Sequence, residues 1–141
     1  MGRYFKQSEI GCGCGCGAAK VAPGLIELAD AVREDLGVPL HIGSSVRCER
    51  HNLQVGGRPG SLHLPQEDGA GYALDLSYFR VSDRSPINAA RLYIALENHG
   101  RGHGPLGLGL YEWGCHVDLR GSAPTPRPAA RWQSFPWPLL K

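Results

Sequence analysis

The spacing of apolar residues switches repeatedly between a helical and an alternating pattern, and this switching limits the possible folds more than any other feature. Two stretches, 23–36 and 86–99, repeat apolar side chains at helical spacing, and a glycine follows each of them. Strand patterns occupy four shorter stretches, at 38–44, 70–79, 107–111 and 115–119. Because these elements interleave without regular strand–helix–strand spacing, they predict an α+β fold in which two main helices flank a small antiparallel sheet.

Length and composition indicate one domain with long loops. A chain of 141 residues can bury roughly two thirds of its unfolded surface, so we expect a single domain over 1–141. The 20 glycines and 11 prolines predict many turns, with a Cys- and Gly-containing lead-in over 1–22 and a Pro-rich tail over 121–141 that wraps the surface. The formal net charge of +2 does not argue for nucleic acid, and no run reaches the roughly 18 apolar residues of a membrane span. We expect a monomer that binds no nucleic acid and does not cross a membrane.

Two histidines and one aspartate form the most informative polar set. His63 lies in a loop, Asp75 in the strand pattern of 70–79, and His116 in the last strand pattern. Imidazole and carboxylate groups suit zinc, and three such ligands leave a fourth tetrahedral position open for water. The set therefore predicts one zinc ion in a hydrolytic site.

Two carboxylates are candidates for a general base near that site. Asp118 stands two residues after His116, so on a strand both side chains face the same side of the sheet. Glu112 stands four residues before His116, and a turn around Trp113-Gly114 could bring it over the metal. Either carboxylate can move a proton from water to the leaving amine. The alternatives are a structural partner for Asp118 and a solvated turn for Glu112.

The five cysteines are unusual in their placement. Cys12, Cys14 and Cys16 alternate with glycine, whereas Cys48 and Cys115 are solitary. One interpretation is a loop that binds a soft metal or acts in redox chemistry, although metal sites usually place two or more residues between ligands. The interpretation that this spacing favours is a flexible loop of reduced thiols, with one disulfide to Cys48 as a variant. Cys115 is expected to be a small buried residue.

Several short phrases occur in an order that resembles a known family. The phrases are Ser44-Ser45-Val46-Arg47-Cys48, His51-Asn52, Gly56-Gly57, Ser61-x-His63, Gly71-x-Ala73-x-Asp75, His116-x-Asp118 and Arg131-Trp132. Together they resemble the zinc D-Ala-D-Ala carboxypeptidases and related peptidoglycan endopeptidases, which include phage endolysins and share their fold with the hedgehog signalling domain. The resemblance runs from about Tyr4 to Trp132, and the Cys-Gly lead-in is similar to that of the phage and bacterial branch.

The resemblance implies a site and an activity. It makes His63, Asp75 and His116 the ligands of one zinc ion, and Arg47 the residue that holds a substrate carbonyl or carboxylate. It implies hydrolysis of a bond next to a D-amino acid in peptidoglycan stem peptides, by a carboxypeptidase or an endopeptidase. Residues 64–68 form an insertion relative to the family. Either a surface loop absorbs it at small entropic cost, or it reshapes the edge of the substrate cleft and changes substrate preference. The alternative is a non-catalytic zinc-containing module of the same fold that binds cell wall or a protein.

The start of the chain bears on localisation. Residues 1–6 lack the apolar stretch of a secretory signal, so we expect synthesis in the cytoplasm. By analogy with the family, the site of action would be the periplasm or cell wall, reached by a separate release route.

Overall fold

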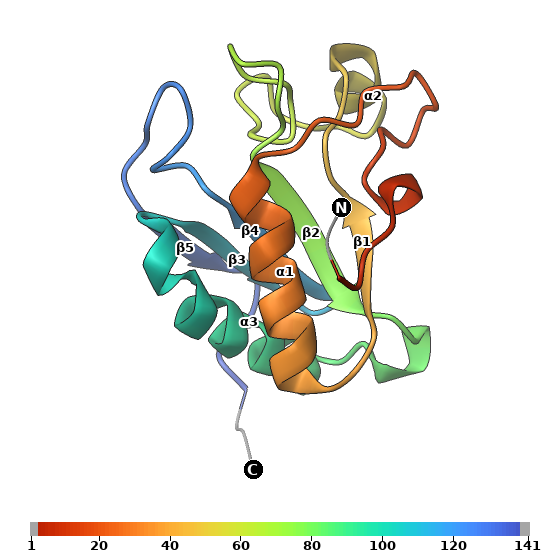
Figure 1. Ribbon diagram of the computed structural model, residues 1–141. Helices are drawn as coiled ribbons and strands as arrows, with labels where there is room; N and C mark the ends of the chain where they lie inside the picture. Colours follow the sequence, from red (N-terminus) through yellow and green to blue (C-terminus); the bar gives the residue numbers. More distant parts are fainter. Residues whose placement is uncertain (1–2, 139–141) are drawn as a thin grey trace.

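The computed structural model describes residues 3–138 and contains a five-stranded sheet with two helices packed on one face (Figure 1). The two long helices are α1 (Pro23–Leu36) and α3 (Pro86–Gly100). The strands are β1 (Leu40–Ser44), β2 (Ala73–Tyr78), β3 (Gly107–Tyr111), β4 (Gly114–Asp118) and β5 (Ala130–Gln133), in the spatial order β1-β2-β4-β3-β5. The connections contain the short helix α2 (Glu49–Gln54) and 3₁₀ turns at Gln7–Glu9, Val81–Asp83 and Arg101–His103. The predicted α+β fold is confirmed.

Both long helices begin and end where the sequence predicts. Each has proline at its first position, where the missing N–H removes no helical hydrogen bond. The Ser85 hydroxyl caps α3 by accepting a hydrogen bond from Asn88 N at 3.2 Å. Gly37 ends α1 with a φ of 67°, a left-handed conformation that glycine adopts without steric cost. No helix within residues 3–138 is long and apolar enough to cross a membrane.

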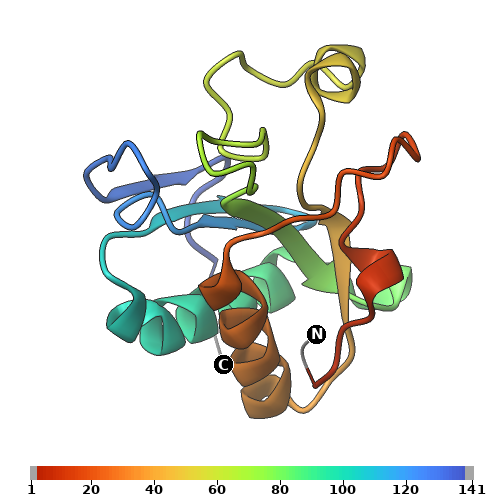
Figure 2. The ribbon, with the colours of Figure 1, turned by 45° about the horizontal axis from the view of Figure 1, so that its top comes forward.

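Side chains alternate between the two faces of the sheet, and this alternation separates the core from the polar face. The helix-facing side carries buried apolar residues, which are Leu74, Leu76, Leu108, Leu110, Cys115 and Val117. They pack against apolar residues of α1 and α3, and Figure 2 shows both helices beneath the sheet. The residues between them in sequence, including Asp75, His116 and Asp118, therefore point to the opposite face.

The fifth strand corrects the expectation that the sheet is purely antiparallel and that 121–141 only wraps the surface. β5 pairs with β3 in parallel, with Gly109 opposite Trp132. The direction follows from the path of the chain, because β4 ends beside the start of β3 and the chain re-enters the sheet at that same end. A side chain at position 109 would overlap the Trp132 indole, so this glycine lets β5 place an aromatic ring over the polar face.

Candidate metal centre

Three segments bring the predicted ligands together on the polar face of the sheet. Asp75 and His116 are direct partners in the antiparallel β2–β4 pair, so their side chains lie next to each other. His63 comes from the loop before β2, and the Leu62 carbonyl accepts a hydrogen bond from Tyr72 N at 2.8 Å, which fastens this loop to the start of the strand. The structure therefore unites residues that are far apart in the chain, since His116 follows Asp75 by 41 positions and His63 precedes Asp75 by 12.

The distances within this group fit a shared metal ion. Asp75 Oδ1 lies 3.3 Å from His63 Nε2 and 3.2 Å from His116 Nδ1, and one ligand atom from each residue lies within 4.8 Å of the others. Two ligands at about 2.05 Å from a tetrahedral zinc ion are separated by about 3.3 Å. The side chains can hold zinc with little rearrangement.

Outer hydrogen bonds orient both imidazoles toward Asp75. His63 Nδ1 lies 2.6 Å from the Ser45 carbonyl oxygen, so this nitrogen donates and Nε2 is left to bind a metal. His116 Nε2 lies 2.7 Å from Asp118 Oδ2, which leaves Nδ1 as the nitrogen that faces Asp75. Each histidine thus has one anchored nitrogen and one available nitrogen, the usual arrangement of metal-binding imidazoles.

The charges around His116 determine its protonation in the absence of metal. Burial would lower the pKa of His116, but the hydrogen bonds to Asp118 and Asp75 more than offset this and raise the pKa to about 9. Burial would also raise the pKa of Asp75, yet its bonds to His116 and His63 hold that pKa well below the usual range. The metal-free site at neutral pH therefore keeps a proton that zinc binding must release.

Asp118 is anchored on the side of the His116 ring away from Asp75. Its side chain is 1% exposed and accepts two hydrogen bonds from the Arg120 guanidinium, each of 2.9 Å, and one from Gly107 N at 3.1 Å. Burial acts to raise the pKa of Asp118, but Arg120 and His116 keep it below the usual range. This geometry favours the structural alternative for Asp118 over the role of general base. The sequence analysis did not identify Arg120 as a residue of the site. Its position two residues after Asp118, which puts both side chains on the same face of an extended chain, could have indicated the contact.

Glu112 and Arg47 lie at the edges of the group. Glu112 is exposed in the turn between β3 and β4, and within residues 3–138 no hydrogen bond or ion pair joins it to the three candidate ligands. Arg47 is half-buried, and its Nη1 donates to Asn52 Oδ1 at 3.0 Å. Its Nε is buried and has no hydrogen-bond partner among the described residues. Burial lowers the pKa of Arg47, while the nearby Asp75 carboxylate acts in the opposite direction.

Aromatic residues form a wall beside His116. The Trp132 ring lies 5.3 Å from the His116 ring, and Trp132 Nε1 donates to the Tyr111 hydroxyl at 2.7 Å. Tyr111 in turn stacks on Trp113, with ring centroids 5.2 Å apart. Trp132 was noted in the sequence only as part of a family phrase, because its contact with His116 depends on the parallel β5 pairing.

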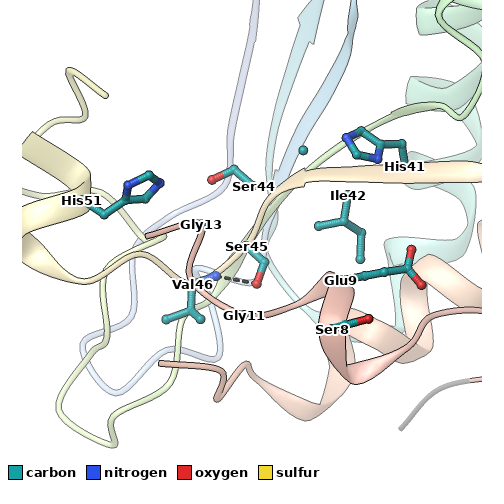
Figure 3. A pocket seen from close by; sticks show the side chains of 11 residues that line it. Ser8, Glu9, Gly11, Gly13, His41, Ile42, Ser44, Ser45, Val46 and His51 are labelled. Carbon is teal, nitrogen blue, oxygen red and sulfur yellow. Dashed lines mark hydrogen bonds between the residues drawn. The ribbon is translucent and has the colours of Figure 1, made fainter. Parts of the chain in front are cut away.

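A cavity of about 350 Å³ lies between the N-terminal segment and β1 (Figure 3). Its lining includes Gly11 and Gly13 of the N-terminal segment, together with Ser44, Ser45 and His51. The three candidate ligands do not line this cavity; the link is Ser45, whose carbonyl accepts from His63. The cavity is therefore a neighbour of the candidate metal centre and not the centre itself.

Comparison with known proteins agrees with this geometry. A family model described as Peptidase M15 matches residues 3–118, which is most of the chain and includes the candidate ligands and Asp118. No curated protein and no solved structure gives a significant match.

Replacing Asp118 by Asn should lower the pKa of His116 from about 9 in the metal-free protein and weaken zinc binding at this centre by about 10- to 100-fold. The reason is that the amide no longer balances the imidazolium charge and no longer holds Nε2. Both effects can be followed through the His116 imidazole signals by nuclear magnetic resonance, during pH and zinc titrations. The exposed Asp83→Asn is the matched control, and unchanged titrations in Asp118→Asn would contradict the anchoring role.

Proposed function

The chain belongs to the M15 peptidases, and we propose that it hydrolyses a peptide bond next to a D-amino acid in the stem peptides of peptidoglycan. M15 peptidases are zinc-dependent, and we propose that His63, Asp75 and His116 bind the catalytic zinc ion. The observation that carries this proposal is the convergence of two available imidazole nitrogens on one carboxylate oxygen, at 3.2 and 3.3 Å.

The exposure of the three side chains supports a catalytic centre that is open on one side. The His63 side chain is 3% exposed, whereas those of Asp75 and His116 are 22% and 16% exposed. Solvent and substrate can therefore approach from the side of the two strands. A structural zinc site would be closed by a fourth protein ligand.

The remaining residues supply proton transfer and binding. When bound, zinc polarises the scissile carbonyl and lowers the pKa of a water molecule. We assign the general base to Glu112, because Asp118 already accepts hydrogen bonds from His116, Arg120 and Gly107. Glu112 can take the proton of the attacking water and pass it to the leaving amine once the exposed turn brings it over the site.

Arg47 is proposed to bind the substrate. Asn52 accepts a hydrogen bond from its Nη1, whereas its Nε has no hydrogen-bond partner within residues 3–138. The guanidinium is therefore held in place while one of its donors stays available. A substrate carbonyl or carboxylate would satisfy that donor and offset the cost of burying the cation. Gly57 packs against both side chains, and a Cβ there would overlap Asn52.

The zinc-loaded protein should release new peptide fragments from purified peptidoglycan, and a chelator should prevent their release. Mass spectrometry of the digest would identify the bond cut and so distinguish carboxypeptidase from endopeptidase activity. His116→Ala should lose both zinc at this centre and activity, because the tetrahedral set becomes incomplete. Retained turnover in that variant would overturn the ligand assignment. Absence of fragments from a protein that holds zinc would favour the non-catalytic binding module.

Glu112→Gln should reduce kcat by about 100- to 10,000-fold while zinc binding stays intact, because the amide cannot accept the proton of water. The pH–rate profile should also lose its acidic limb. Glu49→Gln is the matched control and should keep the parent rate, because Glu49 is an exposed carboxylate at the start of α2. If Glu112→Gln keeps the rate of the parent protein, another group is the base.

Arg47→Lys should raise KM or lower kcat/KM by about 10- to 100-fold, because an ammonium group cannot reproduce the planar pair of donors. Steady-state kinetics on the peptide identified above would measure this loss. Arg50→Lys, at an exposed position of α2, is the matched control. Equal kinetics for the two variants would remove Arg47 from the binding site.

A further inference from the structure

Four of the five cysteines converge at one point, although three of them lie in the lead-in and one lies beyond β1. The Sγ atoms of Cys12, Cys14, Cys16 and Cys48 all lie within 4.8 Å of one another. Cys48 stands at the N-cap of α2, 36 residues after Cys12. The convergence is therefore a product of the fold and not of local sequence alone.

The sulfur–sulfur distances distinguish a metal site from a disulfide. Cys12 Sγ lies 3.4 Å from Cys14 Sγ and 3.9 Å from Cys48 Sγ. Cys14 Sγ lies 3.6 Å from Cys48 Sγ. A disulfide needs a separation of about 2.05 Å. Four thiolates at about 2.3 Å from a tetrahedral zinc ion are about 3.8 Å apart. Iron–sulfur clusters hold cysteines around several metal ions, which spreads the sulfurs further.

The backbone conformation of the loop explains how cysteines separated by only one residue can direct their sulfurs to one point. Gly15 and Gly17 have φ values of 77° and 94°, conformations that side chains other than glycine rarely adopt. Cys12 N donates to the Ala18 carbonyl at 2.7 Å and closes the loop on itself. The alternating glycines therefore let three cysteines turn toward one centre, which the usual spacing of metal ligands did not lead us to expect.

Backbone N–H groups also point at the sulfurs. Cys48 N lies 3.4 Å from Cys12 Sγ, and His51 N lies 3.4 Å from Cys48 Sγ. Hydrogen bonds of this kind stabilise negative charge on thiolate ligands, and outer partners like these orient the ligands of metal sites. These N–H groups support the cysteine ligands in the same way that Ser45 and Asp118 support His63 and His116 through hydrogen bonds.

We propose that Cys12, Cys14, Cys16 and Cys48 bind a second, structural zinc ion. Four sulfur ligands complete a tetrahedron and leave no position for water, so this ion would have no direct part in hydrolysis. It fastens the segment 11–17 to the start of α2. Gly11 and Gly13 of that segment line the cavity in Figure 3, and Cys48 directly follows Arg47.

Metal content measured on the intact protein tests this proposal. The wild-type chain should hold two zinc ions, whereas Cys48→Ser and His116→Ala should each hold one. Cys115→Ala is the matched control, since this buried cysteine lies on the helix-facing side of the sheet, and it should hold two. A Cys48→Ser variant that retains two ions would overturn the cysteine site, and a His116→Ala variant that retains two would overturn only the catalytic centre.

Two further measurements on the wild-type protein need no variant. Replacement of zinc by cobalt should give thiolate-to-cobalt charge-transfer absorption, which nitrogen and oxygen ligands cannot produce. In the zinc-loaded protein, Cys12, Cys14, Cys16 and Cys48 should react slowly with a thiol reagent until a chelator is added. Absence of the cobalt band, fast reaction of all four thiols, or iron in place of zinc would each refute the proposal.

Discussion

The antiparallel pairing of β2 with β4 places Asp75 beside His116, and the rest of the candidate centre depends on this register. A slip of one residue in either strand would turn the candidate ligand of that strand toward the helix-facing side, where Leu76 and Cys115 now lie buried. The slip would also expose the buried apolar side chains of that strand to water. Hydrophobic packing on one face of the sheet therefore holds the polar groups in position on the other.

The polar face carries a row of alternating charges. Asp75, His116, Asp118 and Arg120 follow one another, and each contacts its neighbour at 3.2 Å or less. Burial alone would favour the neutral form of every titratable group in this row, but each neighbour of opposite charge favours the ionised form. The row keeps the Asp75 carboxylate ionised and, without metal, the His116 imidazole protonated, so metal binding at this centre must release a proton and depends on pH.

One short segment after β1 connects the proposed functions of the molecule. The Ser45 carbonyl orients His63, Arg47 has an Nε donor without a partner in the described part of the chain, and Cys48 supplies a sulfur to the cysteine cluster. A backbone hydrogen bond of 2.7 Å from Arg47 N to the His63 carbonyl ties this segment to the loop before β2. The proposed metal ligand His63, the proposed substrate contact Arg47 and the proposed structural metal site thus meet at one short segment.

The sequence by itself determined the helices, four of the strands and the residues able to form the candidate centre, because apolar periodicity is local and few side chains suit zinc. Only the tertiary structure decided that β5 runs parallel to β3, since that depends on where β4 ends. The same holds for Asp118, because its proximity in sequence to His116 says nothing of Arg120 and Gly107, whose hydrogen bonds occupy it. The tertiary structure also decided the cysteine cluster. Cys48 reaches the lead-in only because segments distant in sequence pack together, and the spacing of residues in the sequence does not give their distances in the folded protein.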